Sequence, residues 1–239
     1  MEFRESNGGM LSGMTRFSDH LDDMPAIGYA RANLDHDRVG KYLLLLHGHA
    51  ANYQSRGAFF STEQMSLYGE GLFRNGAVGE LGANFCTPSQ TLVASMTAMQ
   101  LVATHWDHNE VWLARAAPRR WYGPFDGGFG VENAPTRYGN VSYSVGGRMA
   151  GQSTASVSVR VDFSPYPGDV ASASSAGQEP PTLLIRIRDL DGTHVISKAG
   201  VDPVHATGVR SVSVDVALEV VAVNLTGWTA AFNLSVTFQ

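Results

Sequence analysis

The chain has 239 residues, of which 44% are hydrophobic, and its formal net charge is −5. This length suffices for one large domain or two ordinary ones with a real core, and the composition argues against global disorder. The 17 lysines and arginines form no run, which excludes nucleic acid and membrane as main partners, because both require clustered basic charge or long apolar runs.

The sequence leaves the compartment open. Residues 1–16 are polar and glycine-rich and lack the apolar core of a secretory signal. Cys86 is the single cysteine, so no intrachain disulfide is possible, which fits a reducing compartment only weakly. Sequons begin at Asn140, Asn224 and Asn233, but such triplets are frequent by chance.

Apolar residues at helical spacing extend from Tyr29 to about Trp112. Within this range, residues 39–50 place their apolar side chains near one helix face. The four consecutive leucines at 43–46 predict that this first helix is buried on more than one side.

A second helix has a clear beginning. Thr87 is a suitable N-cap, Pro88 suits the first helical position, and Gln90 follows the cap by three residues. We expect this helix to end near residues 107–110. Its apolar face is formed by Leu92, Met96, Met99, Ala103 and Trp106.

The stretch between the two helices, residues 54–86, is irregular and rich in glycine. A loop of this length inside a compact domain is uncommon unless it has a function. We interpret it as a surface rim or as the wall of an active site.

The second half of the chain has the pattern of strands. Valines 157, 159 and 161 alternate with polar residues, as apolar residues do again at 212–218 and 234–238. Asp191-Gly192 is typical of a tight hairpin between strands at 184–190 and 194–197. Several short strands with such turns predict an antiparallel β-sandwich. We place the boundary near Pro118, with a helical domain at 1–117 and the sandwich at 118–239.

Four strings resemble the C-terminal end of the six-hairpin (α/α)6-toroid glycosidases of the glucoamylase-like clan. They lie at residues 47–57, 61–64, 86–90 and 111–121. The resemblance extends over roughly residues 12–143. It implies an α+β, multidomain chain, in which residues 1–117 are the terminal helical hairpins of an α/α toroid and an antiparallel β-sandwich follows.

The resemblance also implies a sugar cleft. In the string Ser61-Thr62-Glu63-Gln64, Glu63 corresponds to the general base that activates water in an inverting glycosidase. Gln64 would hold this base or bind a sugar hydroxyl. The other substrate-binding residues would be Tyr53, Arg56 and Phe60. Neither a cofactor nor a metal site is expected.

The general acid is missing from the predicted cleft. In this clan it lies on an earlier helical hairpin, and a complete toroid has more helices than this chain supplies. We therefore expect a fragment that completes its cleft with a missing toroid segment or a partner subunit, and that has little activity alone.

A purely structural role is the alternative to each of these functional interpretations. Glu63 is also consistent with a role in stabilising its loop. The last helix would be attached to the sandwich by stacking and ion pairs of Arg115, Arg119 and Trp112. The alternative function is a non-catalytic carbohydrate-binding or protein-interaction module. In that case the sandwich binds the ligand and the helices form a docking platform.

Overall fold

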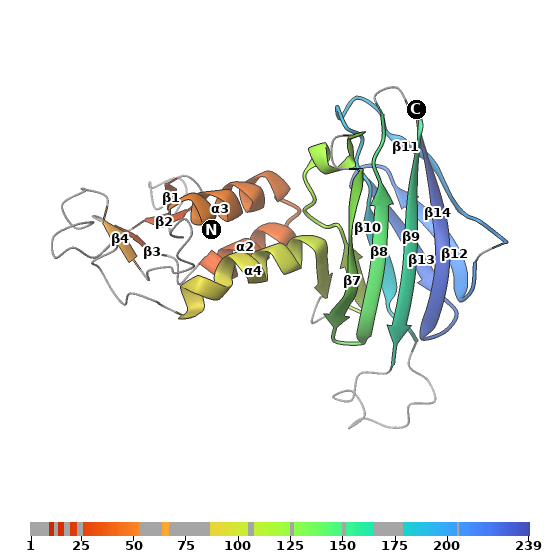
Figure 1. Ribbon diagram of the computed structural model, residues 1–239, viewed down its shortest axis with the longest axis horizontal. Helices are drawn as coiled ribbons and strands as arrows, with labels where there is room; N and C mark the ends of the chain where they lie inside the picture. The colour runs from red at the N-terminus through yellow and green to blue at the C-terminus, as the bar shows by residue number, and fades with distance from the viewer. Residues whose placement is uncertain are drawn as a thin grey trace. The chain divides into compact units, whose positions relative to one another are not determined.

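The computed structural model describes residues 10–11, 14–16, 20–22, 26–52, 64–66, 87–104, 108–124, 127–149, 152–164, 179–204 and 206–239. It has three N-terminal helices followed by two five-stranded sheets packed together (Figure 1), which confirms the α+β class. The contacts divide the chain into two compact units, 1–99 and 100–239. This division falls earlier than the boundary that we predicted near Pro118.

The first unit contains the helices and a small sheet. The helices are α2 (Ala26–Asp35), α3 (Val39–Asn52) and α4 (Thr87–Leu101), the last of which reaches into the second unit. The sheet has four antiparallel strands in the order β1-β2-β3-β4. They are β1 (Met10–Leu11), β2 (Met14–Arg16), β3 (His20–Asp22) and β4 (Gln64–Ser66). No helix in the described ranges is long and apolar enough to cross a membrane.

A tight turn joins α2 to α3. Asp37 has a φ of 54°, and its N–H donates to the carbonyl of Leu34 at 2.9 Å, while the N–H of Arg38 donates to the carbonyl of Asn33 at 2.7 Å. These are the two hydrogen bonds of a Schellman motif, which ends α2 with a left-handed residue. The motif allows α3 to begin almost immediately.

The prediction that α3 is buried on more than one side is wrong, because only half of its leucine run is buried. Leu45 and Leu46 are buried, and Leu44 is 52% exposed. Tyr42 on the same helix is buried, and its hydroxyl donates to the carbonyl of Met96 on α4. The buried positions of α3, at 39, 42, 45, 46 and 49, recur at helical spacing and therefore share one face of the helix.

The predicted end of the second helix is wrong. Helix α4 ends at Leu101, and the chain continues directly as β5 (Val102–Thr104), which pairs antiparallel with β6 (Glu110–Leu113). The β-branched residues Val102 and Thr104 suit a strand. Sheet pairing has overridden the helical spacing at Val102–Thr104 and at Trp112.

One sheet of the second unit has the strand order β12-β13-β10-β6-β5. Its other strands are β10 (Thr182–Arg186), β12 (Val209–Asp215) and β13 (Val220–Leu225). The pair β10–β6 is parallel, which corrects the prediction of a wholly antiparallel sandwich. Parallel pairing is possible because the chain between these strands makes a long excursion through three strands of the other sheet.

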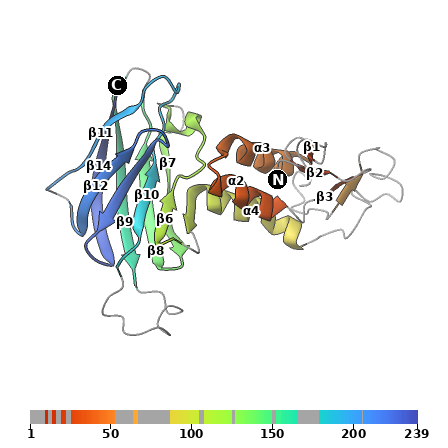
Figure 2. The same ribbon diagram turned by 180° about the vertical axis from the view of Figure 1, so that it is seen from behind.

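The other sheet has the order β11-β14-β9-β8-β7 and is antiparallel throughout. Figure 1 shows it in front, and the view from behind in Figure 2 brings β6, β10 and β12 forward. Its strands are β7 (Gly128–Thr136), β8 (Gly139–Gly146), β9 (Thr154–Phe163), β11 (Ile196–Val201) and β14 (Thr229–Phe238).

The sandwich core confirms the predicted alternation. Every second residue of β9 and of β14 is buried, including Val157, Val159 and Val161. These side chains meet Leu183, Ile185 and other residues of the facing sheet in one core cluster. Burial of this apolar area is the main stabilising contribution to the unit.

The predicted hairpin at Asp191-Gly192 is wrong, because β10 and β11 belong to different sheets. The connection between them crosses from one layer of the sandwich to the other. Gly192 still adopts a left-handed conformation, with a φ of 71°. The glycine correctly indicated a turn at this position, but a glycine does not indicate which strands the turn connects.

Arg119 and Arg115 make ion-pair and stacking contacts within the second unit. Arg119 lies on the short 3-10 helix η1 (Arg119–Tyr122) and binds both carboxylate oxygens of Glu219, at 2.7 and 2.8 Å. The Arg115 guanidinium lies 4.5 Å from the centre of the Trp112 ring. Arg119 therefore links η1 to the residue that precedes β13, whereas the contact of Arg115 joins residues only three positions apart.

Candidate binding site on the sandwich

Of the predicted sugar-cleft residues, the structure describes only Gln64. Tyr53, Arg56, Phe60 and Glu63 lie outside the described residues. Gln64 opens strand β4. The predicted cleft therefore stays a prediction, and the described part of the chain offers a different site.

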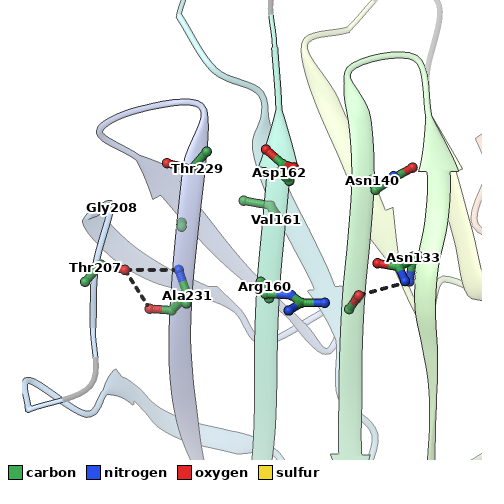
Figure 3. A pocket seen from close by; sticks show the side chains of 11 residues that line it. Asn133, Asn140, Arg160, Val161, Asp162, Thr207, Gly208, Thr229 and Ala231 are labelled. Atoms are coloured by element: carbon green, nitrogen blue, oxygen red, sulfur yellow. Dashed lines mark hydrogen bonds between the residues drawn. The ribbon is translucent and has the colours of Figure 1, made fainter.

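That site is an open groove on the outer face of the β11-β14-β9-β8-β7 sheet, with a volume of about 690 Å³ (Figure 3). We call it the outer groove. Its lining residues come from strands far apart in the sequence and are mostly polar. They are Asn133, Asn140, Ser142, Arg160, Val161, Asp162, Thr207, Gly208, Thr229, Ala230 and Ala231.

The sheet register explains why the groove is hollow around Arg160. The direct cross-strand neighbours of Arg160 are Ser142 on β8 and Ala231 on β14. Both side chains are small, so the long Arg160 side chain has space on either side. Figure 3 shows it extending from β9 toward β8.

A second row of polar residues crosses the same strands. Asp162 on β9 pairs with Asn140 on β8 and with Thr229 on β14. Successive outward residues on a strand are about 7 Å apart. The groove therefore presents the row that contains the Asp162 carboxylate beside the row that contains the Arg160 guanidinium.

A second hollow of about 360 Å³ continues the groove on the other side of Arg160. It shares Ser142, Arg160 and Ala231 with the outer groove. Its further outward residues are Glu132, Ser144, Ser158 and Asn233. The two hollows thus form one polar depression with Arg160 between them.

Backbone interactions fix both walls of the outer groove. On β7, Asn133 has a φ of 51° and lies at a bulge, where its N–H donates to the Ser142 hydroxyl at 2.9 Å. On the opposite wall, Thr207 and Ala231 form an isolated antiparallel bridge. The Thr207 hydroxyl also donates to the Ala231 carbonyl at 3.3 Å. These contacts preform the walls before any ligand binds.

The charged groups of the outer groove are available to a ligand. In the described part of the structure, the side chains of Arg160 and Asp162 make no ion pair and no hydrogen bond with another side chain. Together with Asn140 and Thr229, they offer hydrogen-bond donors and acceptors to solvent. No group of three or more potential metal-ligating side chains occurs among the described residues.

A separate charged cluster lies where β8 and β14 end. Arg148 and Asp189 are both buried and form an ion pair at 2.7 Å. The other Asp189 oxygen accepts the backbone N–H groups of Thr193 and His194, at 3.0 and 3.1 Å. The Arg148 guanidinium also lies 4.0 Å from the centre of the Phe238 ring. The two opposite charges of this cluster are paired with each other, so we assign it a structural role.

Of the residues that line the two hollows, Asn140 and Asn233 were named from the sequence only as sequon asparagines, and no binding site was predicted there. The available signal was the polar half of the alternating strand pattern, which contains Ser158, Arg160 and Asp162. In comparisons with protein-family models, curated proteins and solved structures, nothing matches this chain. Any function must therefore be inferred from the site itself.

Proposed function

We propose that the second unit is a non-catalytic carbohydrate-binding module and that the outer groove binds a sugar chain. The observation that carries the proposal is an open, preformed depression lined by amide, hydroxyl, carboxylate and guanidinium groups. Sugars present many hydroxyl groups, and each of these side chains is able to donate or accept a hydrogen bond to them.

The dimensions of the depression suit a chain rather than a single sugar. From Asn133 on β7 to Thr207 beside β14, the central row crosses four strand spacings, or about 19 Å. Hydrogen bonding to exposed groups contributes little net free energy per bond. We therefore expect weak binding that strengthens as the sugar chain becomes longer.

A pair of matched variants of the full-length protein tests the proposal. Ala231→Leu fills the floor of the groove, and Ser235→Leu places the same side chain four residues further along β14, outside both hollows. Both original residues are exposed, so neither change disturbs the core. Isothermal titration against a panel of neutral and acidic polysaccharides should show binding that Ala231→Leu abolishes and Ser235→Leu retains.

Two results would overturn the proposal. The first is that the full-length protein binds no polysaccharide of the panel. The second is that Ala231→Leu binds as well as the unmodified protein.

The helical unit supports a second candidate function. The α2–α3 pair is a helical hairpin closed by a short turn, and hairpins of this kind are the building unit of an α/α toroid. With the sequence resemblance, this favours a contribution to one wall of a glycosidase cleft, with Glu63 as general base. The substrate-binding residues would be Gln64, Tyr53, Arg56 and Phe60.

The glycosidase candidate has a separate test. The full-length protein is combined with any adjoining toroid segment, and the release of reducing sugar is measured for the unmodified protein and for Glu63→Gln. A general base predicts a large loss of turnover with little change in fold, whereas full activity of Glu63→Gln would remove this assignment.

A further inference from the structure

We infer that the sugar chain bound in the outer groove is acidic, and that Arg160 is the residue that selects it. This inference rests on the proposed carbohydrate-binding function. The chemistry that Arg160 would recognise is an oxyanion, either a carboxylate or a sulfate group, carried by the sugar.

The position of Arg160 suits a cation that binds a ligand rather than one that pairs with a carboxylate on the protein surface. It occupies the centre of the depression and lines both hollows. Two carboxylates share the face, Asp162 on the same strand and Glu132 on β7, yet no ion pair joins either of them to Arg160 within the described ranges. The guanidinium therefore keeps its hydrogen-bond donors for a ligand.

The small neighbours of Arg160 leave room for an oxyanion. Ser142 and Ala231 leave space on both sides of the side chain, so a carboxylate or sulfate group is able to approach the guanidinium edge. Guanidinium binds carboxylate and sulfate oxygens through two parallel hydrogen bonds, which are stronger than hydrogen bonds between neutral groups.

The carboxylates determine where the anion lies. Asp162 is two residues beyond Arg160, about 7 Å along β9, and it repels an oxyanion on that side. The anion is therefore expected on the opposite side, in the hollow lined by Ser158 and Asn233. Glu132 also lines that hollow but lies two strands from β9, roughly 10 Å away.

These positions predict variants with opposite effects. Arg160→Gln removes the cation and should weaken binding of an acidic chain by about tenfold to a hundredfold. Arg160→Lys keeps the charge but loses the paired hydrogen bonds, so binding should be intermediate. Glu132→Gln removes a repulsive charge and should strengthen binding of the acidic chain a few-fold.

The experiment compares acidic and neutral forms of the same polysaccharide by isothermal titration of the full-length protein. The carboxylate arm uses polygalacturonate and its methyl ester, and the sulfate arm uses dextran sulfate and dextran. Arg210→Gln is the matched control, because Arg210 is exposed on β12 of the other sheet. We expect the acidic member of one pair to bind at least tenfold more tightly. Arg160→Gln, and not Arg210→Gln, should remove that preference.

The outcomes separate this inference from the proposed function. If neutral and acidic members bind equally, or if Arg160→Gln leaves the preference intact, the inference is wrong while carbohydrate binding stands. If no polysaccharide of either kind binds, both are wrong. The arm in which the preference appears identifies the oxyanion as carboxylate or sulfate.

Discussion

Replacing Asp189 with asparagine should strongly destabilise the sandwich. The carboxylate and its partner Arg148 are only 6% and 5% exposed, and they lie 2.7 Å apart. At about 4 Å between charge centres and an effective dielectric constant of about 20, their attraction is roughly 4 kcal/mol. Nε and Nη1 of Arg148 are buried and find no hydrogen-bond partner among the described residues. Asp189→Asn therefore leaves a buried, uncompensated cation, and we expect a loss of about 3–5 kcal/mol.

The same carboxylate gives the variant a distinctive pH dependence. Burial alone raises the pKa of the Asp189 carboxyl. The Arg148 guanidinium and the backbone N–H groups of His194 and Thr193 outweigh burial and hold the pKa well below its ordinary value. A depressed folded pKa means that the unfolded chain binds the proton first as the pH falls. This stabilisation is thus present above the ordinary pKa of aspartate and is lost as the pH falls below it.

Urea unfolding followed by tryptophan fluorescence measures both effects. The tryptophans among the described residues, Trp112, Trp121 and Trp228, all lie in the second unit, so their signal reports on the sandwich. Asp191→Asn, a change of an exposed neighbouring aspartate, is the control and should alter stability by less than about 0.5 kcal/mol. The reasoning is refuted if Asp189→Asn costs less than about 1 kcal/mol at pH 7. It is also refuted if the variant loses stability between pH 5 and pH 3 as steeply as the unmodified protein.

Three further changes have expected results by the same assay. Tyr122→Phe removes a buried hydroxyl that donates to the Arg186 carbonyl at 2.8 Å, so it should cost about 1–2 kcal/mol; wild-type stability would contradict this hydrogen bond. Glu219→Gln breaks the bidentate pair with Arg119, which is 38% exposed, and the 3.5 Å pair with Arg188, which is 13% exposed. The loss should be about 1–3 kcal/mol, and the part due to Arg119 should shrink in high salt. Gly208→Ala should cost more than 1 kcal/mol, because the φ is 74° and an added Cβ would lie 2.5 Å from the Thr229 carbonyl oxygen; an unchanged midpoint would show that the rim relaxes freely.

The strands were predictable where their pattern is local. Valines 157, 159 and 161 alternate with polar residues, and a period of two requires no knowledge of the partner strand. By contrast, Val102–Thr104 continues an apolar helical pattern and becomes a strand only because it pairs with β6. Propensity and spacing do not contain that tertiary contact.

The parallel pairing and the groove were not predictable for a related reason. The β6–β10 pair joins residues such as Val111 and Leu183 that are far apart in the sequence. The polar residues Arg160 and Asp162 are visible as outward positions, but their surroundings depend on register. That Ser142 and Ala231 flank Arg160, and so create the hollow, follows only from the three-dimensional pairing.

An amide chemical-shift titration of the full-length protein shows whether a sugar chain binds in the outer groove. The ligand is the polysaccharide fragment with the highest affinity in the calorimetric panel. We predict that the largest shifts occur at Ser142, Arg160, Asp162, Thr229 and Ala231, with little change on the opposite sheet around Val212 and Ala222. Shifts confined to the helical unit or to the opposite sheet, or no shifts at saturating ligand, would contradict binding in the outer groove.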